Sequence, residues 1–257
     1  MTTALRAYFD VLALALGATL GSFLNCAAWR IARDEPFVRG RSRCPVCGRT
    51  LAARDLVPVL SWLALRGRCR YCGGRVSARY PLTELLFAAL TLACFERFGV
   101  TVEAARDLVF LACLMCLSLV DLDAMIIPDG CLVIAAGAWA LCAPFCGVTW
   151  AGALCAAAAG LVFGGALLLL SLALDKALGK ESLGGGDVKL VAVTGLYLGF
   201  VGTLFTLVLA CVLGLALAPA LRKRAGQAFP FGPALSAAAA AMLLWGGGAV
   251  EWYLGLF

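Results

Sequence analysis

Two short acidic segments of this 257-residue chain carry residue types that could hydrolyse a peptide bond. The first is residues 121–129 (DLDAMIIPD), and the second is residues 184–189 (GGGDVK). Ionisable side chains are costly in a lipid bilayer, so acidic groups held at the ends of apolar helices indicate a functional site. The members of this candidate site are Asp121, Asp123, Pro128 and Asp129 from the first segment, and Gly184, Gly186, Asp187 and Lys189 from the second.

The composition leaves carboxylates, Lys, Tyr or Cys for any acid–base chemistry. The chain contains no histidine, which excludes Ser-His-Asp and Cys-His proteolysis and histidine-ligated catalytic metals. In hydrolysis by two carboxylates, one is ionised and activates water while the other is protonated and acts as the acid. Two carboxyl groups held close together resist double ionisation, which supplies both forms. The pattern pairs Asp187 with one of Asp121, Asp123 or Asp129 and does not choose among them.

The residues around Asp187 favour an accessible, negatively charged side chain. Glycines before Asp187 permit backbone conformations closed to other residues and let a substrate chain come close. A helix that begins there stabilises negative charge on Asp187 at its N-terminus. Single acids also have simpler explanations, since Asp129 can be a helix cap and Asp123 a solvated neighbour. The aspartates outside the two segments are interpreted as solvated ends or partners of nearby Lys and Arg: Asp10, Asp34, Asp55, Asp107 and Asp175.

Four of the 13 cysteines form a second candidate site. Cys44 and Cys47 make one CxxC element, and Cys69 and Cys72 make another. Their spacing is typical of a four-thiolate zinc site. A cytoplasmic loop is kept reduced, so metal is favoured over disulfides, and the ion would stabilise a loop too small for its own core. A third CxxC element, residues 113–116, lies in an apolar stretch and is interpreted as packing.

The rest of the chain is too apolar for an ordinary soluble domain. Hydrophobic residues make up 63% of the sequence and charged residues 14%. Several apolar stretches approach the ~20 residues that a helix needs to cross a bilayer, and they lack the alternation of a membrane barrel. We therefore predict an all-α, polytopic membrane protein with about eight transmembrane helices and a cytoplasmic zinc-binding loop. The candidate spans are residues 11–28, 82–95, 104–120, 131–145, 151–174, 188–200, 201–221 and 234–250.

Basic residues orient these spans. Twelve of the 21 Lys and Arg lie in residues 30–79, and Arg222, Lys223 and Arg224 form a second cluster. Because positive charge marks cytoplasmic loops, eight spans place both clusters and both acidic segments in the cytoplasm and both termini in the periplasm. Topology thus explains the net charge of +6, and we expect membrane lipid but no nucleic acid as a partner. Three regions are predicted: a first transmembrane helix (1–30), the cysteine loop (31–81) and a transmembrane protease domain (82–257).

Together these segments resemble the type IV prepilin peptidase family of GxGD membrane aspartyl proteases over nearly the whole chain. The shared motifs are GSFLN (21–25), the two CxxC elements, PVLSW (58–62), SARYPLTE (77–84), residues 121–129, residues 184–189 and PFGP (230–233). The resemblance implies that Asp121 and Asp187 are the catalytic pair. It also implies that they cut prepilin or pseudopilin leader peptides, after a glycine beside the hydrophobic helix, on the cytoplasmic side of a bacterial inner membrane.

The same resemblance implies a second activity. Chains with the four cysteines are similar to bifunctional enzymes that also methylate the new N-terminal residue, using S-adenosylmethionine as the cofactor. In such enzymes the cysteine loop belongs to the methyltransferase activity. The resemblance therefore implies zinc and S-adenosylmethionine as cofactors, and type IV pili or type II secretion as the process served, without assigning residues to the second cofactor.

Three other classes of protein fit parts of the pattern. A transporter could use Asp and Lys as an ion relay, although transport sites usually lie near the membrane midplane. A non-catalytic assembly scaffold could bind a cytoplasmic partner through the zinc loop, and it would tolerate Asn at the acidic positions. A presenilin-like protease is the nearest alternative among GxGD proteases, but that group uses a Tyr-Asp motif where this chain has Val120 before Asp121.

Overall fold

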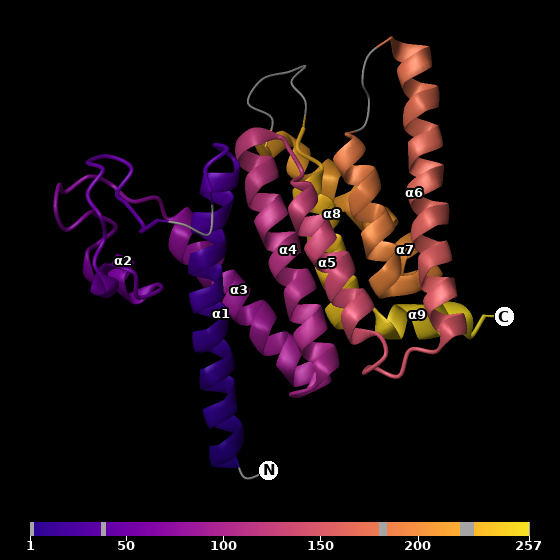
Figure 1. The fold of residues 1–257 in the computed structure, drawn as a ribbon, viewed down its shortest axis with the longest axis horizontal. Helices are drawn as coiled ribbons and strands as arrows, with labels where there is room; N and C mark the ends of the chain where they lie inside the picture. The colour runs from indigo at the N-terminus through magenta and orange to yellow at the C-terminus, as the bar shows by residue number, and fades with distance from the viewer. Residues whose placement is uncertain (1–2, 37–39, 180–183, 222–228, 257) are drawn as a thin grey trace. The chain divides into compact units, whose positions relative to one another are not determined.

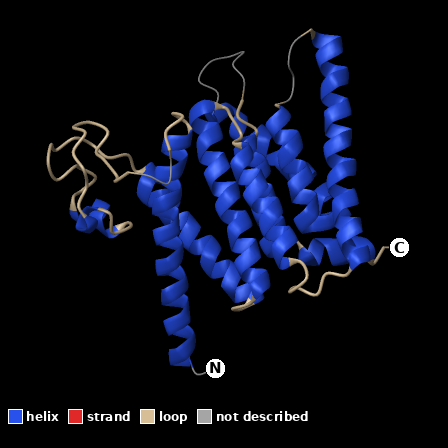
Figure 2. Ribbon diagram, in the orientation of Figure 1, coloured by secondary structure: helices blue, strands red, loops and turns tan. Residues whose placement is uncertain are grey.

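The structure, a computed structural model, describes residues 3–36, 40–179, 184–221 and 229–256. Over these residues every regular element is a helix and no strand is present (Figure 2). The chain divides into two compact units, Met1–Val100 and Thr101–Phe257. The all-helical prediction is confirmed, whereas the basic cluster predicted at residues 222–224 lies outside the described residues.

Two long helices, α1 (Thr3–Ile31) and α3 (Arg79–Phe98), make up most of the first unit and pack against each other. Small residues make this close approach possible. A Cβ atom on Gly17 would come within 2.6 Å of the Cα atom of Ala88, so no larger residue fits there without moving a helix. The side-chain amide of Asn25 also donates a hydrogen bond to the Thr83 hydroxyl of α3.

A polar loop joins these two helices and contains two short helical elements, η1 (Ala53–Asp55) and α2 (Leu60–Ala64). Asp55 ties the two halves of the loop together. Its carboxylate accepts hydrogen bonds from Arg70 Nε at 2.7 Å and from the Tyr71 hydroxyl at 2.9 Å. The Arg70 hydrogen bond is the main reason that the pKa of Asp55 lies below its usual range. The prediction that Asp55 is the partner of a basic residue is confirmed.

The second unit is a helical bundle (Figure 1). Its elements are α4 (Val102–Ala124), α5 (Asp129–Cys142), α6 (Trp150–Leu178), α7 (Gly185–Leu221), α8 (Gly232–Trp245) and α9 (Gly247–Leu254). Helix α4 packs against α5 and α8, and α7 packs against α6 and α8. The hydroxyl of Thr101 accepts the Ala104 N–H at 3.1 Å, which caps the start of α4. Glu103 in the first turn adds a favourable negative charge there.

Helices α6 and α7 pack through small residues. A Cβ atom on Gly195 would lie 2.4 Å from the backbone nitrogen of Gly160, and one on Gly160 would lie 2.3 Å from the carbonyl oxygen of Ala192. Gly164 approaches the Cβ atom of Ala192 in the same way. These contacts are what a small-xxx-small stripe provides in a membrane helix pair, so the GxxxG of residues 160–164 has a packing role.

Helix α7 is broken at Gly199, whose φ of 63° and ψ of −167° lie outside the helical region. A positive φ favours glycine because a side chain would be strained there. The sequence predicts two spans at this point, residues 188–200 and 201–221, and the break falls within two residues of their boundary. The break divides α7 into a shorter first arm, residues 185–198, and a longer second arm, residues 200–221, which at about 1.5 Å per residue extend about 21 Å and about 33 Å.

The two arms of α7 fold back on each other. At the start of the first arm, Gly186 lies against the connection between α4 and α5, and Gly214 in the second arm lies against the N-cap residue of α8. Both positions are at the end of the unit where α4 finishes. Tyr197, two residues before the break, instead stacks on Phe110 in the first half of α4, with ring centroids 3.9 Å apart. Gly199 is therefore the turn of a helical hairpin.

The last predicted span is not one straight helix. Residues 234–250 are interrupted after Trp245, and α8 and α9 meet at an angle of 75°. Gly246 lies at the bend. Among the described residues, three helical segments are long and apolar enough to cross a membrane: Thr3–Ile31, Trp150–Ala177 and Gly185–Ala218, the last of which contains the break at Gly199. The bent pair α8 and α9 would be a fourth. Apolar helices of this kind support a membrane protein, while the count of eight spans stays a prediction.

Candidate active site

Asp121 lies in the last turns of α4 and is buried, with 6% of its surface exposed. Its Oδ2 atom accepts the backbone N–H of Gly232 at 3.0 Å. Gly232 is the first residue of α8 and belongs to the PFGP segment. A Cβ atom at this position would come within 2.7 Å of the same oxygen. Glycine is thus what lets the α8 backbone reach and orient the carboxylate.

Asp187 lies in the first turn of α7 and is also buried, with 8% of its surface exposed. The prediction that it sits at a helix N-terminus is confirmed, and the helix dipole there favours a negative charge. Its Oδ1 atom is buried without a hydrogen-bond partner among the described residues. A buried carboxylate oxygen with no donor is costly unless water or a ligand binds it, so this oxygen is available to a substrate or a water molecule.

Asp121 and Asp187 face a common site from two different helices. Asp121 lies close enough to Asp187 for its charge to act on that carboxyl group. Both side chains are shielded from solvent, where charges interact more strongly than in water. Two carboxyl groups in such a site favour the state in which they share one proton. Asp121 is thus the predicted partner that lies close to Asp187, whereas Asp129 binds Lys189 and Asp123 is exposed.

The glycines before Asp187 allow a close approach. A Cβ atom on Gly186 would lie 2.7 Å from the Cβ atom of Ile127, in the connection between α4 and α5. One on Gly184 would lie 3.3 Å from Asp187 Oδ2. Gly184 also accepts the Asp187 N–H through its carbonyl at 3.0 Å. The glycines thus bring the start of α7 against the segment that follows Asp121.

Lys189 and Asp129 form an ion pair that ties the start of α7 to the start of α5. The Lys189 Nζ atom lies 2.8 Å and 3.0 Å from the two carboxylate oxygens of Asp129. Both side chains are more than half exposed. The interpretation of Asp129 as a helix cap is wrong, because Pro128 occupies the N-cap position of α5 and the carboxylate points to Lys189 instead.

Asp123 is exposed and lies two residues after Asp121 in α4, as expected for a solvated neighbour. Two positions along a helix turn a side chain to a different face, so Asp123 is directed away from the pair. After Ala124 the chain leaves the helix through Met125, which has a left-handed backbone with φ of 55°. This turn and the N-cap residue Pro128 set the direction in which α5 starts.

The four predicted zinc ligands lie together in the first unit. The Sγ atoms of Cys44, Cys47, Cys69 and Cys72 are all within 4.8 Å of one another, and those of Cys44 and Cys72 are 3.9 Å apart. Four thiolates around a zinc ion, each with a bond of about 2.3 Å, hold their sulfurs about 3.8 Å apart. The donor set and its spacing therefore fit a structural zinc ion.

The two CxxC elements have the same backbone conformation. Gly48 donates its N–H to the Cys44 carbonyl at 2.8 Å, and Gly73 donates to the Cys69 carbonyl at 2.9 Å. Both glycines have left-handed backbone angles, with φ of 68° and 70°. Only glycine adopts this turn without strain, and the turn directs both cysteines of a pair to the same point. The first cysteine of each pair is buried and the second is exposed.

The third CxxC element is not isolated. Cys113 and Cys116 of α4 both lie close to Cys131 of α5. All three are buried, so they pack α4 against α5 as small apolar side chains do. The sequence interpretation of residues 113–116 as packing agrees with this position.

Two residues that position the candidate sites were missed in the sequence. Gly232 holds Asp121 from the far end of the chain, 111 residues away. Glu84 of α3 is buried and accepts the Val59 N–H at 2.7 Å. Val59 has a φ of 60°, which is strained for a β-branched residue. Both lie in motifs quoted above, PFGP and SARYPLTE, but spacing alone gives no reason to single them out.

Comparison with known proteins agrees with this arrangement. Residues 15–98 match the family model described as Bacterial Peptidase A24 N-terminal domain, and residues 108–218 match the Type IV leader peptidase family. Together the two models cover the cysteine loop and both acidic segments. No solved structure matches the chain.

Several curated relatives are named prepilin leader peptidase/N-methyltransferase. The chain is 40% identical over 227 residues to the one from Myxococcus xanthus (strain DK1622), an alignment that covers 86% of this chain and 66% of that protein. It is 36% identical to the one from Pseudomonas putida, covering 93% of this chain and 92% of the relative. It is 34% identical to the one from Bacillus subtilis (strain 168), with 93% and 95% covered.

Proposed function

The chain belongs to the type IV leader peptidase family, and on that premise we propose that it is a membrane aspartyl endopeptidase whose catalytic groups are Asp121 and Asp187. Its substrates are type IV prepilins or pseudopilins, and it cuts their leader peptides on the cytoplasmic side of the bacterial inner membrane. The observation that carries this proposal is the closeness of the two buried carboxyl groups, together with the buried Asp187 Oδ1 atom, which has no hydrogen-bond partner among the described residues.

The two carboxyl groups divide the work of hydrolysis. Asp121 accepts the Gly232 N–H, and a donor of this kind stabilises a negative charge on the carboxylate. We assign Asp121 as the base that takes a proton from water, and Asp187 as the acid that donates a proton to the carbonyl oxygen of the scissile bond. The water oxygen then adds to the carbonyl carbon. When the C–N bond breaks, the proton held by Asp121 passes to the leaving amine, and the acid group regains its own.

The positioning residues fit a site that admits an extended chain. Glycines at positions 184 and 186 leave little side-chain bulk beside Asp187, so a substrate backbone can approach the pair. The Lys189–Asp129 ion pair joins α7 to α5 next to the site. A prepilin would insert its apolar N-terminal segment among the helices and leave its basic leader in the cytoplasm, which agrees with the proposed orientation of eight spans with both termini in the periplasm.

The cysteine loop of the first unit, residues 31–81, is the proposed methyltransferase part. Its four cysteine thiolates would hold a structural zinc ion, which stabilises the fold of a loop with little core of its own. S-adenosylmethionine would supply the methyl group that is transferred to the newly exposed N-terminal amine. This division assigns residues 31–81 to methylation and residues 82–257 to cleavage.

Substitution of the two aspartates tests the proposed protease. We expect Asp121→Asn and Asp187→Asn each to lower the rate of prepilin cleavage by about a thousandfold, because each removes one partner of an acid–base pair. Asp123→Asn is the matched control, since Asp123 lies in the same helix but is exposed, and it should cleave at the parent rate. The assay uses purified full-length protein in detergent with a purified prepilin. Cleavage at the parent rate by either paired variant would contradict the proposal.

A further inference from the structure

The bundle of the second unit has a charged cavity at the end opposite the aspartate pair. Its volume is about 400 Å³, and Glu103, Arg106, Trp139, Tyr197, Gly199 and Phe200 contribute to its lining. Arg106 is separated from Asp121 by about 22 Å along α4, at 1.5 Å per residue. The cavity is thus a separate site, and nothing in the proposed proteolysis uses it.

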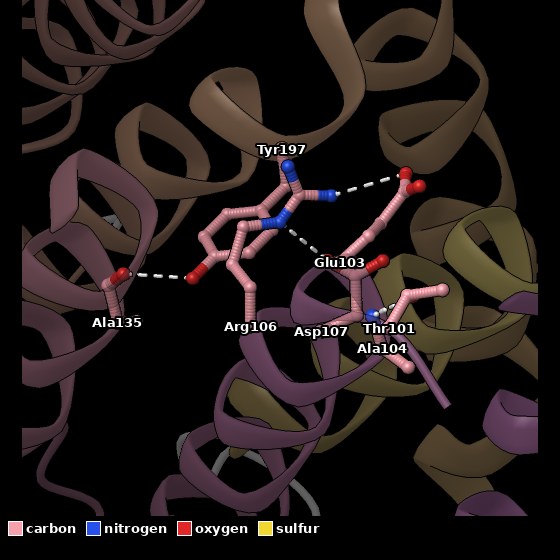
Figure 3. Close-up of polar contacts among 7 residues, drawn as sticks. All are labelled: Thr101, Glu103, Ala104, Arg106, Asp107, Ala135 and Tyr197. Carbon is pink, nitrogen blue, oxygen red and sulfur yellow. Dashed lines mark hydrogen bonds and ion pairs between the residues drawn. The ribbon is translucent and has the colours of Figure 1, made fainter. Parts of the chain in front are cut away.

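Arg106 is buried, and its neighbours hold it in place (Figure 3). Its Nε atom donates to Asp107 Oδ1 at 2.7 Å, and its Nη2 atom lies 3.5 Å from Glu103 Oε1. The guanidinium carbon lies 5.6 Å from the centre of the Tyr197 ring. The Tyr197 hydroxyl in turn donates to the Ala135 carbonyl at 2.8 Å, which fixes the ring.

Arg106 and Asp107 each have hydrogen-bonding groups without a partner among the described residues. A guanidinium has five N–H donors, and two of them have acceptors among the described residues. Asp107 is 1% exposed, and its Oδ2 atom has no partner in the described part of the chain. Burying an arginine is costly unless its charge and donors are satisfied. Asp107 neutralises the charge, and the donors that remain on Arg106 are available to a ligand in the cavity.

The break in α7 borders the same cavity. Gly199 and Phe200 line it, and they are where the second arm of α7 begins. The first N–H groups of a helix have no acceptor within that helix, and they attract anions. A buried arginine and a helix start that face one cavity are two independent features that favour a phosphate group.

Glu103 adds an acid to the same lining, and its side chain is half exposed. A carboxylate would repel a ligand that is purely anionic, but it would attract one that carries an amine a short distance from its phosphate. The cavity also lies where helices end, since Glu103 is in the first turn of α4 and Val148 of the lining precedes α6. In a membrane protein this is the depth of lipid headgroups.

We propose that this cavity binds the headgroup of an aminophospholipid of the phosphatidylethanolamine class. The phosphate accepts hydrogen bonds from Arg106 and from the N–H groups at the start of the second arm of α7. The ammonium group pairs with Glu103. The apolar part of the lining, including Phe200 and Trp139, faces the glycerol and the first methylenes of the acyl chains. The volume suits a bound small group, because ligand pockets start at about 300 Å³.

Lipid titration of the full-length protein in detergent micelles, followed by native mass spectrometry, tests this assignment. Phosphatidylethanolamine should bind at least about fivefold more tightly than phosphatidylglycerol, which has the phosphate but lacks the amine. Glu103→Gln should abolish that preference while leaving binding of phosphatidylglycerol at or above the parent affinity. Glu96→Gln is the matched control, because Glu96 also pairs with an arginine, Arg6, but lies in the other unit.

A second variant tests the phosphate contact. Arg106→Lys keeps the positive charge beside Asp107 and so preserves the fold, but it loses the planar array of donors. It should weaken both lipids by a similar factor of about five. Soluble phosphoethanolamine should compete with the lipid more strongly than inorganic phosphate does. Equal affinity of the parent for the two lipids, an unchanged preference in Glu103→Gln, or equal competition by inorganic phosphate would each overturn the proposal.

Discussion

The cysteine loop and the aspartate pair are both assembled sites, but they are assembled over different distances. The loop brings its outermost ligands, Cys44 and Cys72, together across 28 residues by two copies of the same glycine turn. The aspartate pair needs three helices, and the donor that orients Asp121 comes from 111 residues away. The geometry of the cysteine cluster is set by local turns. The geometry of the aspartate pair is set by how the helices of the bundle pack.

Removal of a zinc ligand should cause the largest of the predicted changes. It should abolish zinc binding by the cysteine loop and leave cleavage by the aspartate pair nearly unchanged. Cys69→Ser should lower the zinc content of the purified protein from about one ion per chain to almost none, because structural sites need all four ligands. Prepilin cleavage should stay within about threefold of the parent, since both aspartates are in the second unit. Elemental analysis and the cleavage assay measure the two outcomes.

Cys211→Ser is the control for this comparison, because Cys211 is an exposed cysteine of α7. It should keep its zinc. Zinc retained by Cys69→Ser would show that the loop binds no metal through this residue, and a parallel loss of cleavage would show that the two sites depend on each other.

Gly232→Ala should lower the rate of prepilin cleavage strongly, although it adds only one methyl group. The added methyl group would lie 2.7 Å from Asp121 Oδ2, so either the carboxylate or the start of α8 must move. A displacement of this order in a catalytic group lowers the rate by about a hundredfold. Gly130→Ala in α5 is the matched control, since its surroundings are open, and its rate should match the parent. An unchanged kcat in Gly232→Ala would contradict the positioning role.

Asp55→Asn should weaken zinc retention by the cysteine loop, but less than removal of a cysteine does. Asp55 binds Arg70 and Tyr71, which lie between the two cysteines of the second CxxC element. Zinc release to a chelator should accelerate by about fivefold, less than for residues that contact a ligand directly. Because the pKa of Asp55 is lowered by Arg70, its contribution is present above the unfolded pKa and is lost only as the pH falls below about 4.

The ratio of release rates between Asp55→Asn and the parent should therefore be constant between about pH 5 and pH 8. A ratio that falls across this range would contradict the assignment of an ionised Asp55. The rate of zinc release from Asp55→Asn can be followed with a chromogenic chelator at each pH.

Loss of the Lys189–Asp129 ion pair should change the cleavage rate least. Both side chains are exposed, and exposed pairs contribute at most about 1 kcal/mol. Lys189→Gln and Asp129→Asn should each slow cleavage by about threefold at low salt, and the double variant should be no slower. Added salt at about 0.5 M should remove the difference because it screens exposed charges. Effects that multiply in the double variant would show that the two residues act separately.

Local patterns in the sequence predicted much of this molecule. The CxxC spacing and the following glycines identified a cluster whose backbone turns are local. The apolar stretches predicted where helices lie, and the boundary predicted between residues 200 and 201 falls beside Gly199, where the backbone leaves the helical region. The GGGD segment predicted a helix start at Asp187, and α7 begins at Gly185.

Features that depend on contacts between distant parts of the chain could not be predicted from local sequence patterns. Asp129 is wrong as a cap because its pairing with Lys189 depends on how α5 and α7 meet. The bend at Gly246 was missed although three consecutive glycines, residues 246–248, interrupt the stretch 234–250 and mark a break. Asp107 was interpreted as a solvated end or a partner of a nearby basic residue; it does bind Arg106, but both side chains are buried, which the sequence did not indicate.

The proposed hydrolytic mechanism requires that Asp121 and Asp187 act as one unit. A double variant tests this requirement directly. Single-turnover cleavage of a prepilin is measured for Asp121→Asn, Asp187→Asn and the variant with both changes. If the two groups share one acid–base function, the double variant should retain the same residual rate as each single variant. Rate losses that multiply, so that the double variant is slower by the product of the two single factors, would contradict a shared catalytic pair.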